Sequence, residues 1–88
     1  MICKRVYYSG RVQGVGFRYT ASHLASGFAV AGFVRNLPNG DVELLAEGEA
    51  DQVEALLKAV ADFMWGNISR VTVHDEPPGG RQGFTIVR

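Results

Sequence analysis

The spacing of the apolar residues alternates along this chain between the two-residue repeat of a strand and the repeat of about 3.6 residues of a helix. Phe17, Ala21, Leu24, Ala25 and Phe28 form one helical stripe, and a second stripe ends at Met64. The alternation predicts, in order, a strand within 3–12, a helix from about 18 that Gly27 caps, strands over 30–36 and 41–48, a helix over 49–64, a strand over 68–76 and a short strand over 84–88.

This order is the split β-α-β pattern of ferredoxin-like folds with one strand added at the end. We therefore expect an α+β sandwich in which both helices pack on one face of a largely antiparallel sheet. At 88 residues the chain is long enough for one core only, so residues 1–88 are expected to form a single domain. The third strand alternates in polarity, which predicts one buried and one partly wet face.

The glycine-rich segment "SGRVQGVGFRYT" joins the first strand to the first helix and places Arg18 where that helix begins. The N-terminus of a helix carries partial positive charge and free N–H groups, so it disfavours a cation unless an anion lies between them. The spacing excludes three known phosphate loops: the P-loop lysine is missing, Tyr19 stands where a dinucleotide fingerprint needs Gly or Ala, and Ser9 stands where a cysteine phosphatase needs Arg. An anion site or a flexible connection remains.

The charges of the chain are unevenly distributed although they sum to zero. Residues 1–40 contain no Asp or Glu, whereas residues 41–88 contain all nine acidic residues. This asymmetry favours a small anion near the N-terminal half, and the neutral total argues against broad nucleic-acid binding. Chance and an acidic second helix also explain it, and Arg11 and Arg35 either raise the local potential or are simply solvated.

Compartment and metal content follow from segments that the sequence lacks. There is no signal-peptide-like run and no membrane-length apolar stretch, so we expect a cytoplasmic protein that does not contact a membrane. Cys3 is the only cysteine, which excludes an internal disulfide and a cysteine-clustered metal site. The first 40 residues lack the carboxylates that a metal site would use, so we expect no metal.

Two separated motifs, "GRVQGVGFR" at 10–18 and "GFVRNLPNGDVE" at 32–43, resemble those of the acylphosphatase family over nearly the whole chain. This family of hydrolases cleaves the carboxyl-phosphate bond of acyl phosphates. The resemblance implies that Arg18 holds the phosphoryl oxygens, that Asn36 orients the attacking water, and that no cofactor is needed. It also implies that backbone N–H groups bind the phosphoryl group, those of Gln13, Gly14, Val15, Gly16, Phe17 and Arg18.

Such a site suits the reaction, because an acyl phosphate expels a carboxylate and needs no general acid or metal. The sequence departs from the family where "MWGNISRV" replaces a stretch that is often rich in Gly and Pro, and Leu37 offers no side-chain hydrogen bond after Asn36. His23 is an alternative general base, although a solvated helical histidine is more common. His74 is expected to be structural.

The expected partner is a small-molecule acyl phosphate, with inorganic phosphate or sulfate as competing anions, and the chain is expected to be a monomer. An RNA-recognition module shares this element order, but the acidic third strand lacks the aromatic residues on which bases stack. A regulatory domain that binds an anion without catalysis would need Arg18 but not Asn36. Activity distinguishes that class from an enzyme.

Overall fold

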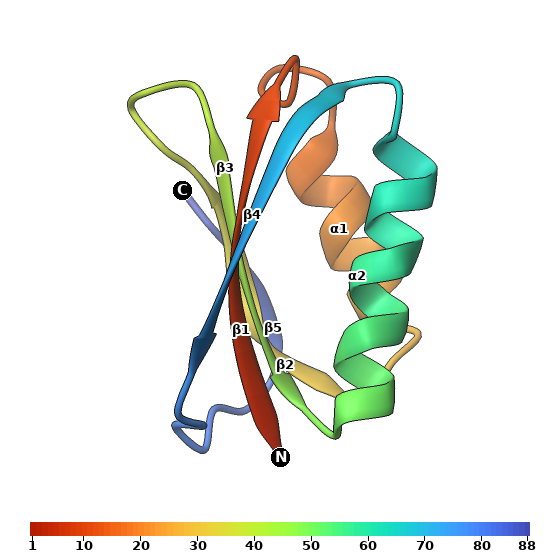
Figure 1. The fold of residues 1–88 in the computed structure, drawn as a ribbon, viewed down its shortest axis with the longest axis vertical. Coiled ribbons are helices and arrows are strands. Elements are labelled where there is room, and N and C mark those ends of the chain that lie inside the picture. Colours follow the sequence, from red (N-terminus) through yellow and green to blue (C-terminus); the bar gives the residue numbers. More distant parts are fainter.

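The computed structural model describes residues 1–88 and contains the helices and strands in the order predicted from apolar spacing (Figure 1). Their bounds are β1 Ile2–Gly10, α1 Phe17–Ala25, β2 Val30–Asn36, β3 Val42–Gly48, α2 Ala50–Met64, β4 Ile68–Glu76 and β5 Phe84–Val87. Neither helix is long and apolar enough to cross a membrane.

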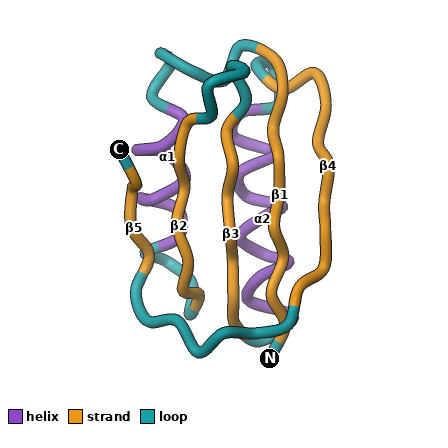
Figure 2. The backbone as a smooth tube through the Cα atoms, turned by 90° about the vertical axis from the view of Figure 1, so that its left-hand side faces the viewer, coloured by secondary structure: helices purple, strands orange, loops and turns teal.

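One five-stranded sheet in the order β4-β1-β3-β2-β5 forms the frame of the molecule (Figure 2). All neighbouring strands are antiparallel except β2 and β5, which run parallel. Both helices cover the same face of this sheet (Figure 1). The ferredoxin-like α+β sandwich expected from the sequence is therefore confirmed, and the added strand lies beside β2 at one edge of the sheet.

The core lies between the helices and the sheet because alternate strand residues point toward the helical stripes. The stripe of α1 is buried at Phe17, Ala21 and Ala25. The other buried apolar members of the core come from the sheet, from α2 and from the segment after β1: Val6, Tyr8, Val12, Val34, Val42, Leu44, Ala46, Val53, Leu56, Val60 and Met64.

The second face of β3 is drier than the sequence predicted. All seven residues of this strand are buried, including Glu43 and Glu47, which are only 3% and 2% exposed. Glu43 is covered by ion pairs with Arg5 and Arg35 from neighbouring strands, and Glu47 is covered by the 79–81 loop. The alternation therefore predicted which residues of β3 share a face. It did not predict that the polar face is buried, because that face is covered by ion pairs and hydrogen bonds from other segments.

The ends of β1 and α1 also differ from the prediction, whereas the starts of β3 and α2 and the end of β5 differ from it by one residue only. β1 ends at Gly10 rather than Val12, because the register with β4 shifts after Ser9 and Arg11 N–H donates to Asn67 O at 2.9 Å instead. Ser26, in a right-handed conformation, caps α1 in place of Gly27.

The exposed surface of α2 carries an ion pair and ends beside two aromatic side chains. Lys58 forms an ion pair with Asp62 at a spacing of four residues. Phe63 and Trp65 are 68% and 78% exposed. They flank Met64, the last residue of α2, whose side chain is buried in the core.

Candidate active site

The 13–18 loop connects β1 to α1 in a conformation that glycine favours. Gly14 and Gly16 have φ angles of 74° and 78°, in the left-handed region that side chains disfavour. A Cβ atom added at either position would meet nothing within 4 Å, so the backbone conformation alone, and not crowding, calls for glycine. Gly16 is also the N-cap of α1, where no side chain caps the helix and the first turn holds no acid.

The backbone N–H groups of residues 13–18 donate no hydrogen bond within the protein. Helix N-termini leave such groups unpaired, and side chains, water or ligands normally satisfy them. Here neither a capping side chain nor a first-turn carboxylate takes that place. The loop and the first turn of α1 therefore offer a run of free donors to an anion, reinforced by the helix dipole.

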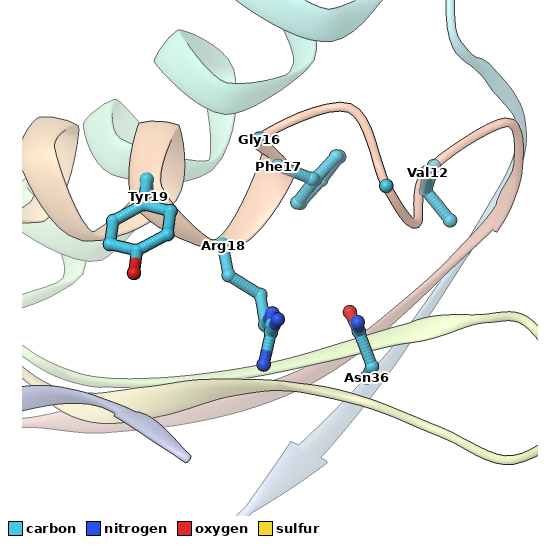
Figure 3. A pocket seen from close by; sticks show the side chains of 7 residues that line it. Val12, Gly16, Phe17, Arg18, Tyr19 and Asn36 are labelled. Atoms are coloured by element: carbon cyan, nitrogen blue, oxygen red, sulfur yellow. The ribbon is translucent and has the colours of Figure 1, made fainter. Parts of the chain in front are cut away.

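These donors border a pocket of about 220 Å³. The residues that line it are Val12, Gly14, Gly16, Phe17, Arg18, Tyr19 and Asn36. Arg18 and Asn36 come from α1 and from the end of β2, and their side chains point toward each other across the pocket (Figure 3). Arg18 is the only charged residue in this lining and forms no ion pair, so its guanidinium is available to a ligand.

Asn36 contributes an acceptor without a partner. Its Oδ1 atom is buried and accepts no hydrogen bond from any group of the protein. An unpaired buried carbonyl oxygen costs about 1–3 kcal/mol, so native structures rarely keep one without a reason. A ligand or water molecule that donates a hydrogen bond to Oδ1 inside the pocket supplies such a reason.

Gln13 holds the two sides of the pocket together. Its Nε2 atom donates to the carbonyl oxygens of Leu37 and Asp41, each at 2.8 Å. Leu37 N–H also donates to Asp41 O at 2.9 Å, which closes the turn between β2 and β3. The family resemblance assigns a role only to the backbone N–H group of Gln13, whereas in the structure its side chain also fixes the turn directly after Asn36.

The side chains of the remaining residues in and beside the loop differ in burial and in whether they line the pocket. Phe17 is 1% exposed and packs against Tyr8 with ring centroids 5.0 Å apart, which anchors the start of α1 in the core. Val15 is 46% exposed and does not line the pocket, so it contributes backbone only. Val12 and Tyr19 line the pocket without having been predicted to do so, because neither residue type signals an anion site.

The basic residues of the N-terminal half do not all serve the pocket. Arg5 and Arg35 both bind Glu43 on the sheet face away from the helices, and Arg5 also binds Glu76. Burial alone would raise the pKa of Glu43, but the hydrogen bonds from the two arginines lower it on balance. Arg35 is therefore neutralised locally, whereas Arg11 is exposed and, like Arg18, forms no ion pair.

No His, Cys, Asp or Glu residues gather in the group of three or more that a metal ion would need. His23 is exposed on α1 and does not line the pocket. His74 lies on β4 and packs its ring edge-on against Tyr7, with centroids 5.9 Å apart. The structure thus brings Arg18, Asn36 and the 13–18 loop together and leaves both histidines outside.

Comparison with known proteins identifies the family of this chain. A family model described as acylphosphatase matches residues 4–86. The acylphosphatase of Acaryochloris marina is 41% identical over 92 residues, which cover 100% of this chain and 96% of that protein. The acylphosphatase of Thermococcus kodakarensis is 46% identical, with 94% and 90% covered. The crystal structure of acylphosphatase from Bacillus subtilis matches with a TM-score of 0.90 and 33% identity over 100% of both chains. This chain belongs to the acylphosphatase family.

Proposed function

We propose that the pocket hydrolyses acyl phosphates to a carboxylate and inorganic phosphate without a metal ion. In this proposal the N–H groups of residues 13–18 and the guanidinium of Arg18 bind the phosphoryl group, and Asn36 orients the attacking water. One observation carries it: a loop of unpaired donors and an unpaired arginine face an unpaired buried acceptor across a single pocket.

The phosphoryl group is the ligand that best matches the donors. Its oxygens carry the negative charge that reconciles Arg18 with the positive end of α1. A guanidinium donates forked hydrogen bonds to two oxygens at once, and the loop N–H groups supply further donors. Charge that shifts among these oxygens in the transition state is stabilised without any movement of the donors, because the loop and the helix turn already hold them.

The displacement of the carboxylate by water needs few further groups from the protein. The oxygen of water attacks phosphorus, the bond from phosphorus to the carboxyl oxygen breaks, and the bonding electrons leave with the carboxylate. A carboxylate is a stable anion, so no general acid has to protonate it, and a loose transition state depends mainly on positioning and charge stabilisation. The proton of the attacking water passes to a phosphate oxygen, since an asparagine amide is not a base.

Asn36 is suited to hold that water. Its Oδ1 atom accepts one hydrogen of the water, which directs an oxygen lone pair toward phosphorus. The turn after Asn36 is fixed by the Gln13 side chain, which also belongs to the loop that binds the phosphoryl group. The water and the phosphoryl group are therefore positioned by one connected set of hydrogen bonds.

The test is the release of phosphate from acetyl phosphate in the presence of a chelator. We expect the chelator to leave kcat unchanged and Arg18→Gln to lower kcat/KM by at least ~100-fold, on the scale of losing a key oxyanion donor. Arg70→Gln is the matched control, because Arg70 is an exposed arginine on β4 that forms no ion pair. Loss of activity in chelator, or full activity in Arg18→Gln, would contradict the proposal.

A further inference from the structure

A second unpaired cation stands beside the pocket. Arg88, which follows β5, donates from Nη2 to the hydroxyl oxygen of Tyr19 at 3.0 Å, and its guanidinium carbon lies 5.8 Å from the centre of the Tyr19 ring. Tyr19 lines the pocket and is 60% exposed. Arg88 forms no ion pair, so its charge, like that of Arg18, is not neutralised within the protein.

Strand register explains why Arg88 reaches this end of the sheet. β5 runs parallel to β2, and Val87 is the partner of Arg35. Asn36 is the last residue of β2 and Arg88 directly follows the last residue of β5, so both residues lie at the same end of the two parallel strands. Tyr19 directly follows Arg18 on α1 and bridges the space between the helix and Arg88.

The pair offers two kinds of donor to an anion. The hydroxyl oxygen of Tyr19 accepts a hydrogen bond from Arg88, so its own proton is free to donate. The hydrogen bond and the charge of Arg88, together with the charge of Arg18, lower the pKa of Tyr19 and make the hydroxyl a stronger donor. Guanidinium N–H groups of Arg88 not used on Tyr19 supply the second kind of donor.

The direction of the reaction places the acyl group on this side. In-line displacement puts the leaving oxygen on the opposite side of phosphorus from the attacking water. Figure 3 shows Asn36 on one side of the Arg18 side chain and Tyr19 on the other. If water is held at Asn36, the carboxylate departs toward Tyr19, and groups attached to that carboxylate pass close to Arg88.

We propose that Tyr19 and Arg88 select acyl phosphates whose acyl group carries a second anion, a carboxylate or a phosphate. The proposal rests on the function proposed above and adds specificity to the same pocket. Binding of the second anion by the pair would add to the affinity for the acyl group and leave the chemistry at phosphorus unchanged. Tyr19 and Arg88 are thus specificity-determining residues, and the reaction proceeds without them on a neutral acyl group.

The test compares benzoyl phosphate with its 3-carboxy and 4-carboxy derivatives, which present one added anion at two distances. We expect Arg88→Gln to lower kcat/KM by about fivefold for at least one carboxylated substrate, the scale of an exposed ion pair, and to leave benzoyl phosphate within about twofold. Arg88→Lys should restore most of the preference because it keeps the charge. Arg70→Gln removes the same charge from β4 at the other edge of the sheet and should change none of these ratios.

Two further measurements separate recognition of the acyl group from a general effect. Tyr19→Phe keeps the aromatic ring that lines the pocket but removes the hydroxyl, so kcat/KM should fall more for the carboxylated substrate than for benzoyl phosphate. The inhibition constant of inorganic phosphate, which has no acyl group, should be unchanged in Arg88→Gln. Added salt should reduce the preference of the unaltered protein, because the pair is exposed.

The inference is overturned if Arg88→Gln lowers kcat/KM equally for all three substrates, or if it weakens inorganic phosphate as much as the carboxylated substrates. It is also overturned if the unaltered protein shows no preference for either carboxylated substrate. These outcomes leave the proposed function intact as long as Arg18→Gln lowers kcat/KM for benzoyl phosphate by at least ~100-fold. Failure of the proposed function appears separately, as undiminished hydrolysis in Arg18→Gln.

Discussion

Two glycine-containing loops of this molecule hold the same kinds of donor but differ in what occupies them. In the 79–81 loop, Gly79, Gly80 and Arg81 donate backbone N–H groups to Glu47 at 2.8, 2.7 and 3.1 Å, and Arg81 adds its guanidinium at 3.3 Å. In the 13–18 loop, backbone N–H groups and Arg18 have no partner within the chain. Both loops contain glycine in the left-handed conformation.

The occupant decides what each loop does. Glu47 is a fixed anion on β3, so the 79–81 loop uses its donors to attach the connection between β4 and β5 to the sheet. Across the pocket from the 13–18 loop stands the neutral Asn36 instead of a carboxylate, which leaves the donors open to an outside anion. One set of donors therefore supports either stability or ligand binding, depending on the charge of the side chain that faces it.

Replacing Asn36, which faces the 13–18 loop across the pocket, should have the largest effect on activity. We expect Asn36→Ala to lower kcat on acetyl phosphate by about 100-fold, because the water loses its acceptor, while the inhibition constant of inorganic phosphate stays within about twofold. Asn39→Ala, in the exposed turn after β2, is the control. A loss of phosphate binding that matches the loss of kcat would assign Asn36 to the binding of phosphate instead of to the water.

Replacing Glu47, which accepts the hydrogen bonds of the 79–81 loop, should lower the stability of the fold and leave catalysis unchanged. Glu47→Gln replaces an anion by an amide whose N–H groups meet the donors of the 79–81 loop, so we expect a lower urea midpoint and a kcat unchanged within about twofold. Glu54→Gln on the exposed side of α2 removes the same charge and should leave the midpoint in place. Equal midpoints for the two variants would contradict the role of Glu47.

The pH dependence of stability offers a sharper form of the same comparison. The hydrogen bond from Gly79, with those from Arg81 and Gly80, lowers the pKa of Glu47 from its ordinary 4.5 against the opposing effect of burial. A lowered folded-state pKa contributes stability above pH 4.5 that is lost as the pH falls through the folded value. Urea unfolding at several acidic pH values should therefore show a shallower decline for Glu47→Gln than for the unaltered protein.

Matched glycine substitutions compare the two loops directly. Gly14 and Gly80 have φ angles of 74° and 72°, and a Cβ atom at either would meet nothing within 4 Å. Alanine should therefore cost about 1–2 kcal/mol of backbone strain at both sites. Only Gly14→Ala should raise the inhibition constant of phosphate, measured beside the urea midpoint of each variant. Equal effects of both variants on phosphate would remove the distinction between the loops.

The smallest expected effect is stabilisation by the anion itself. Inorganic phosphate at a concentration equal to its Kd should stabilise the folded state by about 0.4 kcal/mol, seen as a higher Tm. Sulfate should act in the same way. The shift should vanish in Arg18→Gln and persist in Glu47→Gln, since the 13–18 loop is unaltered in the second variant. A shift that survives Arg18→Gln would place the anion elsewhere.

Local sequence patterns predicted most of the fold. The limits of β2 and β4 agree with the prediction residue for residue, since turn residues mark their ends. The burial of Glu43 and Glu47 could not be predicted, because their partners lie on other strands or more than 30 residues further along the chain. An alternating strand reveals which residues share a face, whereas the cover of that face depends on tertiary pairing.

The candidate site was predictable where its signal is local. Arg18 at a helix start and two nearby glycines are visible as an anomaly in the sequence, so the loop emerged from charge and backbone arguments alone. Asn36 came only from family resemblance, because an asparagine before Leu and Pro is ordinary turn chemistry. The side chain of Gln13 and the pairing of Tyr19 with Arg88 join distant segments, so no spacing rule reveals them.

The reliance of the 13–18 loop on backbone donors also bears on how the gene tolerates change. Every residue except proline carries an N–H group, so a codon change at the exposed Val15 alters the side chain and keeps the donor. Inactivating changes should concentrate at Arg18, Asn36 and the left-handed glycines, at Gln13 and Phe17, whose side chains hold the loop in place, and at proline anywhere in the loop. The exposed Val15 is then the loop position whose side chain can change most freely.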